Sequence, residues 1–269
     1  MKIKNIIYII LSLVLLLLSS CKKDDGKEKL YVYNWGIYLD ETVVDRFEKK
    51  YNCDVIYDTY DTNEEMYAVV KEEARVYDVL CPTDYMVEKM IKKDLLYSYD
   101  IKELPNYKNI DKRILDIMKS FDKDNVYAIP YVHSTLGLIY NKSELDRMGL
   151  PYPKKWADLW NEEYKGEILL QDAMRDLLMV GLKKNNFSMN SLSQDELDIA
   201  TGDLIKQKHL VNAYLIDPLR DKMVAGDGTI ASMYSGEVEY IKSEGSKYQY
   251  EYILPEEGVN FTMDVWVIP

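Results

Sequence analysis

Residues 30–93 decide the fold: LYVYNWGIYLDETVVDRFEKKYNCDVIYDTYDTNEEMYAVVKEEARVYDVLCPTDYMVEKMIKK. Three apolar runs rich in aromatic and β-branched residues predict strands, at residues 30–33, 55–57 and 77–81. Three segments with apolar side chains at helical spacing predict helices, at residues 41–51, 63–74 and 85–93. Asn63 is predicted to cap the second helix. This alternation predicts a mostly parallel sheet with right-handed crossovers, in which ligands bind where strands end and helices begin.

The rest of the chain continues the mixed α/β pattern after a polar stretch at residues 94–125. Residues 127–132 form an apolar run that contains Pro130, and a proline disfavours an uninterrupted central strand. We therefore predict that this run crosses between two lobes. Further strands are predicted at residues 136–141, 167–170, 230–234, 250–254 and 265–268, and further helices at residues 156–160, 175–184 and 196–208.

The N-terminus has the pattern of an export signal. Two lysines precede the apolar run of residues 6–18, which is too short to span a membrane, and Leu18-Ser-Ser-Cys21 follows. This ending resembles the lipobox of bacterial lipoproteins, which implies a signal peptide at residues 1–20, lipidation of Cys21 and a tether at residues 21–28. The alternative is an ordinary signal peptide with an incidental cysteine. The other two cysteines, Cys53 and Cys81, are predicted to be buried apolar residues rather than a disulfide.

The net charge of −12, from 34 Lys and Arg against 46 Asp and Glu, argues against one class of partner. Because this negative charge repels the phosphates of nucleic acids, no nucleic-acid partner is expected. The charge is compatible with a cationic ligand, although solubility alone also accounts for it.

Six segments of the chain, in register, carry a family resemblance. They are residues 31–38 (YVYNWGIY), 57–67 (YDTYDTNEEMY), 82–85 (PTDY), 127–131 (YAIPY), 156–166 (WADLW with EYKG) and 258–264 (GVNFTMD). Together they resemble the spermidine/putrescine-binding proteins of bacterial ABC importers. The resemblance implies a two-lobed, type II periplasmic-binding-protein-like α/β fold. It places the first lobe at residues 29–132 with a return strand at 264–269, and the second lobe at residues 133–263.

The resemblance also implies a set of ligand-binding residues, carried over position by position. They are Trp35, Tyr38, Thr83, Tyr85, Asp172, Asp176, Tyr234, Glu237 and Asp264. Three positions depart from the family pattern. Asp172 comes one residue before the place of a family carboxylate, which is Ala173 here, Tyr234 replaces a tryptophan, and Thr262 stands where a tryptophan is usual. Glu237 matches a carboxylate of putrescine-selective members, so putrescine is predicted to bind more tightly than spermidine.

The function implied by the resemblance is polyamine capture outside the cytoplasm and delivery to the permease subunits of an ABC importer. The protein is expected in the cell envelope, lipid-anchored to the outer face of the cytoplasmic membrane or in the periplasm, with no cofactor and no metal. Family members continue beyond the strand at residues 265–268, so the resemblance also implies that the C-terminal part of the family is lacking.

Four alternatives stay open. An enzyme is disfavoured because only two histidines are present, His133 and His209, and neither lies in a recognisable nucleophile pattern; phosphate-binding glycine motifs are also missing. The second is a receptor of the same architecture for ferric or other metal ions, since oxygen ligands suit hard cations. The third is a structural surface lipoprotein. The fourth is a non-functional fragment of a polyamine receptor.

Overall fold

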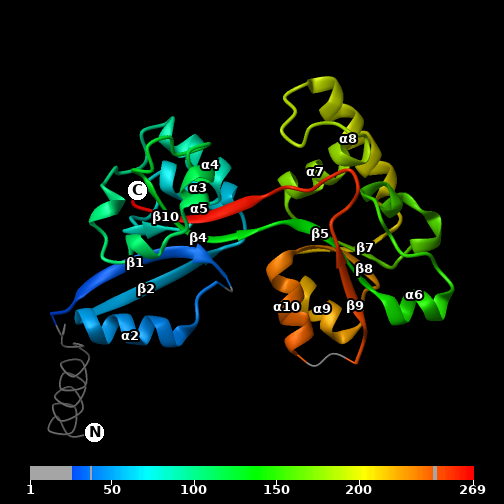
Figure 1. The fold of residues 1–269 in the computed structure, drawn as a ribbon, viewed down its shortest axis with the longest axis horizontal. Helices are drawn as coiled ribbons and strands as arrows, with labels where there is room; N and C mark the ends of the chain where they lie inside the picture. The colour runs from blue at the N-terminus through cyan, green and yellow to red at the C-terminus, as the bar shows by residue number, and fades with distance from the viewer. Residues whose placement is uncertain (1–25, 37, 245–246) are drawn as a thin grey trace, which may run out of the picture.

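The computed structural model describes residues 26–36, 38–244 and 247–269, and these residues form two lobes (Figure 1). Within this described part, each lobe contains one five-stranded sheet, ordered β2-β1-β3-β10-β4 in the first and β7-β6-β8-β5-β9 in the second. The strands are β1 Glu28–Trp35, β2 Cys53–Tyr60, β3 Val79–Leu80, β4 Ala128–Ser134, β5 Leu136–Asn141, β6 Ile168–Gln171, β7 Val211–Leu215, β8 Ile230–Tyr234, β9 Tyr250–Ile253 and β10 Thr262–Val267. The predicted two-lobed α/β fold is confirmed.

In each sheet four of the five strands point in the same direction, as the alternating pattern predicts. In the first lobe β1 pairs in parallel with β2 and β3, and β10 runs antiparallel to β3 and β4. In the second lobe β6 pairs in parallel with β7 and β8, and β5 runs antiparallel to β8 and β9. Each sheet therefore has one reversed strand, and the carboxyl ends of its other strands share one edge.

Helices cover the sheets of both lobes. They are α2 Glu41–Tyr51, α3 Asn63–Lys71, α4 Asp84–Ile91, α5 Lys112–Met118, α6 Lys142–Met148, α7 Met174–Lys184, α8 Gln194–Gln207, α9 Pro218–Ala225 and α10 Ser235–Ser243. The second sheet is buried on both faces: Leu138 of β5 belongs to a core with α7, whereas the next residue, Ile139, belongs to a core with α9 and α10. Alternate side chains of a strand point to opposite faces, which explains the division.

One local prediction, the cap of the second helix, was wrong. The cap of α3 is Thr62, whose side chain accepts from the Glu65 N–H at 3.1 Å, and not Asn63, whose side chain is buried against Thr83. The cap was misplaced by one residue because Thr62 and Asn63 are adjacent and both residue types favour the N-cap position. The segment predicted to be helical at residues 156–160 is confirmed and is a single 3-10 helix, Trp156–Trp160.

The chain crosses between the lobes twice, and both crossings appear in Figure 1. The first crossing is β4 running into β5, and the second is the segment from β9 to β10. Pro130 lies in β4, an edge strand, next to a bulge: Asp264 pairs with Val132 and Val265 with Pro130, which leaves Tyr131 without a partner in the ladder. An edge position with a bulge is where a strand tolerates proline. The predicted lobe boundary at residues 132 and 133 falls inside β4.

The predicted signal peptide and the lipidation site Cys21 lie outside the described residues. Within the described residues, none of the helices is long and apolar enough to cross a membrane. Cys53 and Cys81 are both buried and both carry free thiols, so the prediction of two buried apolar cysteines is confirmed.

Candidate ligand-binding cleft

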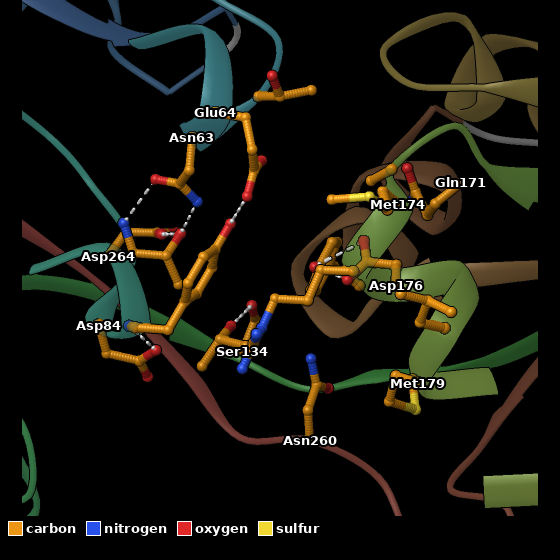
Figure 2. A pocket seen from close by; sticks show the side chains of 18 of the residues that line it. Asn63, Glu64, Asp84, Ser134, Gln171, Met174, Asp176, Met179, Asn260 and Asp264 are labelled. Carbon is orange, nitrogen blue, oxygen red and sulfur yellow. Dashed lines mark hydrogen bonds between the residues drawn. The ribbon is translucent and has the colours of Figure 1, made fainter. Parts of the chain in front are cut away.

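A cleft of about 920 Å³ lies between the lobes, at the edges where the parallel strands of both sheets end. Figure 2 shows Asn63, Glu64, Asp84 and Asp264 on one side and Gln171, Met174, Asp176 and Met179 on the other. Ser134 and Asn260 lie between them, on the two crossing segments. The topology produces this arrangement, because parallel strands place all their following turns at one edge of a sheet.

The lining of the cleft is strongly acidic. Among the described residues, eight carboxylate side chains and two arginines line it: Asp61, Glu64, Asp84, Glu88, Asp176, Asp217, Glu237 and Asp264, with Arg175 and Arg220. A cleft with low-dielectric walls strengthens the field of such a charge distribution. The excess of carboxylates therefore favours a ligand that carries more than one positive charge.

Asp264 of β10 is the most enclosed of these carboxylates, with 4% of its surface exposed. Its Oδ1 accepts from the Thr83 hydroxyl at 2.6 Å, and its Oδ2 accepts from the Tyr38 hydroxyl at 2.8 Å. Burial raises the pKa of Asp264 to about 6, although both hydrogen bonds act in the opposite direction. Burial and the neighbouring Asp264 raise the pKa of the Tyr38 hydroxyl well above its usual value, so Tyr38 stays a donor.

Thr83 holds this arrangement in place from the loop after β3. Its hydroxyl accepts from the Asn63 side-chain NH₂ group at 2.9 Å, and its backbone N–H donates to the side-chain oxygen Oδ1 of Asn63 at 3.1 Å. A backbone bridge joins Thr83 to Asp264. Since Thr83 both accepts from Asn63 and donates to Asp264, one orientation of its hydroxyl satisfies both partners.

The second lobe supplies a carboxylate of the same kind. Asp176 lies in the first turn of α7, and the Tyr234 hydroxyl at the end of β8 lies 2.9 Å from each of its two oxygens. Burial raises the pKa of Asp176 to about 6, against the opposing effects of Tyr234 and the charge of Arg175. The positive end of the helix dipole also favours the ionised form. Asp176 therefore changes between its neutral and ionised forms near pH 6.

Glu237, in the first turn of α10, is a third carboxylate of the cleft. Its Oε2 lies 3.7 Å from Nη1 of Arg220, which stacks over the Tyr240 ring at 3.8 Å from the centroid. Burial raises the pKa of Glu237, and the charge of Arg220 opposes that shift. At 3.7 Å the pair is a loose one, so the carboxylate keeps lone pairs for another donor.

Aromatic rings form the apolar walls of the cleft. Trp35 and Tyr38 have ring centroids 6.1 Å apart, and Trp35 lies 4.6 Å from Tyr60. Tyr85 of α4 donates a hydrogen bond to Glu64 at 3.2 Å, and the guanidinium carbon of Arg175 lies 4.2 Å from its ring centroid. Flat rings beside carboxylates suit a ligand with apolar stems between cationic groups.

The structure brings eight of the nine residues predicted from the sequence to this one cleft. They are Trp35, Tyr38, Thr83, Tyr85, Asp176, Tyr234, Glu237 and Asp264. Asp172 is not among the lining residues; it follows β6, its side chain is exposed, and its N–H donates to the Leu215 carbonyl at the end of β7. Ala173 lines the cleft instead. A one-residue offset at a strand end thus turns the side chain away.

Several lining residues are absent from the sequence-based set, above all Glu64, Asp84, Arg175 and Arg220. Glu64 and Asp84 were detectable, because each begins a helix directly after a strand of the parallel sheet. The two arginines also follow strands, Arg175 at the start of α7 and Arg220 at the start of α9, but their contacts with rings distant in sequence had no local signal.

Comparison with known proteins gives a matching family model and similar curated proteins. Residues 42–269 match the family model of bacterial extracellular solute-binding proteins. The chain is 32% identical over 246 residues to the spermidine/putrescine-binding periplasmic protein of Escherichia coli K12, covering 91% of this chain and 69% of that protein. It is 30% identical over 266 residues to the putrescine/cadaverine-binding protein of Pseudomonas aeruginosa, covering 96% and 74%.

A solved structure agrees with both comparisons. The substrate-binding protein PotD of a spermidine/putrescine ABC transporter from Streptococcus pneumoniae, in complex with calcium and HEPES, superimposes with a TM-score of 0.68 at 33% identity. The match covers 90% of this chain and 73% of that one. The chain therefore belongs to the bacterial extracellular solute-binding proteins and, within them, to the spermidine/putrescine-binding family.

Proposed function

We propose that this protein binds putrescine or spermidine outside the cytoplasm and delivers the polyamine to the permease subunits of an ABC importer. The family to which the chain belongs supports both parts of the proposal. We further propose that Cys21 carries a lipid that holds the protein at the membrane, as the lipobox-like sequence indicates.

The observation that carries the proposal is the acidic, aromatic lining of the cleft. A polyamine has ammonium groups that each need a carboxylate, separated by methylene stems that need flat apolar walls. Among the described residues the cleft supplies eight carboxylates against two arginines, together with Trp35, Tyr38 and Tyr85. Asp264, Asp176 and Glu237 come from three different elements, so they can hold ammonium groups at separate positions.

Isothermal titration of the purified protein tests this function. Putrescine, spermidine and cadaverine are titrated in turn, and 1,4-butanediol serves as a control with the same stem as putrescine but no charge. We expect one polyamine to bind per chain and the diol not to bind, because the carboxylates select for charge. Calcium and ferric ions form a second series. Binding of a metal without binding of any polyamine would replace the proposal with the metal-receptor alternative.

A further inference from the structure

Arg175 reaches from one lobe to the other. It is the second residue of α7 in the second lobe, and its guanidinium carbon lies 4.2 Å from the ring centroid of Tyr85, in α4 of the first lobe. The other cation–π pairs of the described residues all join partners within one lobe. Both residues line the cleft. A cation of the protein itself therefore covers an aromatic wall of the binding site.

The Tyr85 ring is flanked by carboxylates. Its hydroxyl donates to Glu64 at 3.2 Å, and the backbone N–H of Tyr85 donates to the carboxylate of the preceding residue, Asp84, at 2.6 Å. Burial raises the pKa of Asp84 and the pKa of Tyr85, and the charge of Arg175 opposes both shifts. The guanidinium also donates a hydrogen bond to the Asn190 side-chain oxygen, at 3.2 Å. A ring face beside two carboxylates is the environment that a ligand ammonium also needs.

We propose that Arg175 is an internal competitor for one ligand ammonium and thereby determines which polyamine length the cleft accepts. Its guanidinium occupies the face of Tyr85 beside Glu64 and Asp84, so an ammonium binds there only after Arg175 has moved away. This inference rests on the proposed function, since it concerns the selectivity of the same cleft.

The competition affects a triamine more than a diamine. The two ammonium groups of a diamine can pair with Glu237 at one position and with Asp264 or Asp176 at another, and neither pairing requires the Tyr85 face. A third ammonium needs a further acidic position, and the one beside Tyr85 already holds a cation. Exchanging one cation for another on the same ring gives little net free energy. Arg175 thus acts against the longer ligand, which is selectivity by an opposing element.

Substitution of Arg175 tests the proposal by titration of the purified protein with putrescine and with spermidine. Arg175→Met keeps much of the stem and removes the charge; we expect spermidine to bind about fivefold or more tightly, and putrescine to change by less than about twofold, in line with the strength of a cation–π contact. Arg175→Lys keeps a cation and should behave like the parent. Arg147→Met is the matched control, because Arg147 is an exposed arginine of α6, paired with Glu144.

Three results would overturn the role of Arg175: an unchanged ratio of spermidine to putrescine affinity in Arg175→Met, an equal change for both ligands, or the same gain in Arg147→Met. In a Tyr85→Leu background the gain from Arg175→Met should disappear, since the contested ring is then missing. Arg175→Gln replaces Arg175→Met if circular dichroism shows that the latter does not fold. A parent protein that binds no polyamine at all would instead contradict the proposed function.

Discussion

Asp264 combines nearly complete burial with two hydrogen-bond donors, Thr83 and Tyr38, which hold its carboxylate in one orientation. We predict that Asp264→Asn weakens polyamine binding by well over tenfold, because losing one partner of a desolvated charge pair typically costs about 2–5 kcal/mol. Titration calorimetry measures the effect. Asp116→Asn, at an exposed residue of α5, removes the same charge away from the cleft and should leave the affinity unchanged. An unaltered dissociation constant in Asp264→Asn would remove Asp264 from the site.

The raised pKa values of Asp264 and Asp176, both about 6, predict a pH-dependent affinity. Above pH 6 both carboxylates are ionised and ready to accept an ammonium. Below pH 6 each must first release a proton, so the affinity should fall by up to about tenfold per pH unit for each carboxylate. Titrations between pH 5 and 8 measure this fall, and an affinity that is flat across this range would contradict it.

The same shifts have a consequence for the free protein. Both folded-state pKa values lie above the ordinary value of 3.8, so the folded protein binds these protons more tightly than the unfolded chain does. The stability that this proton binding contributes is present at pH values below the ordinary pKa and is lost as the pH rises through about 6. Polyamine binding should restore stability above pH 6, because the ammonium then replaces the proton as the partner of each carboxylate.

Glu237 is the residue on which the predicted preference for putrescine depends. We predict that Glu237→Gln weakens putrescine by about tenfold or more and spermidine by less, because a diamine has fewer ammonium groups to hold it when one loses its partner. A competition titration at equal ligand concentrations measures the preference. Glu239→Gln is the control, since Glu239 lies in the same helix but pairs with Lys242 at the surface. Tighter binding of spermidine by the parent would reject the assignment.

At the residue scale, sequence reasoning located the cleft well where positions could be matched in register. Trp35, Thr83 and Asp264 lie far apart in the chain and still line one cleft, because Trp35 ends β1, Thr83 follows β3 and Asp264 lies near the start of β10, at one edge of the sheet. Asp172 failed because the match was one residue out of register. Arg175 could not be found, because its contact with Tyr85 depends on how the two lobes are placed, and no local pattern reports that.

At the scale of elements, strand β5 illustrates how closely the second lobe is packed. Gly137 lies where an added Cβ would be 2.5 Å from the Ile253 carbonyl oxygen and 2.6 Å from the Tyr252 ring, both in β9. We predict that Gly137→Ala lowers the free energy of unfolding by about 1–3 kcal/mol, the usual cost of overpacking. Urea denaturation measures the change, and a stability equal to that of the parent would contradict the tight contact.

Gly202 provides the matched control for that substitution. It lies inside α8, with no atom within 4 Å of an added Cβ. Gly202→Ala should therefore raise stability by about 0.5–1 kcal/mol, the difference in helix propensity between the two residues. Opposite signs for the same chemical change would separate the packing effect in β5 from the general effect of losing a glycine.

Two of the elements that the sequence analysis missed, α6 and β7, share a physical cause. Helix α6 is seven residues long and buries only Leu145, so it has no apolar periodicity to detect. Strand β7 has half-buried residues on both faces and no clear alternation. By contrast, α2 was predicted closely because Val43, Val44 and Phe47 recur at helical spacing, and β1 because it contains a run of aromatic and β-branched residues. Short elements formed by tertiary packing lack that signal.

At the scale of the whole molecule, the proposed attachment to the membrane depends on Cys21, which precedes the described residues. We predict that Cys21→Ser releases the protein from membranes, because serine offers no thiol for the lipid. Fractionation of cells that express the parent and the variant measures the distribution, and Cys53→Ser is the control, since that buried cysteine belongs to the first sheet. A Cys21→Ser variant that stays in the membrane fraction with its signal sequence intact would reject the lipid anchor.

The paired crossing strands also set the mechanics of the two lobes. Strands β4 and β10 run side by side into the first sheet, and Asp264 lies within their ladder at the floor of the cleft. If one lobe rotated about this strand pair, residues close to the pair would move least, and residues farther from it would move more. Asp264 and Thr83 would stay together through the swing, whereas Arg175 and Tyr85, which lie in different lobes, would separate. As the lobes opened, a bound polyamine would therefore be released one end at a time, and the end nearest the strand pair would be released last.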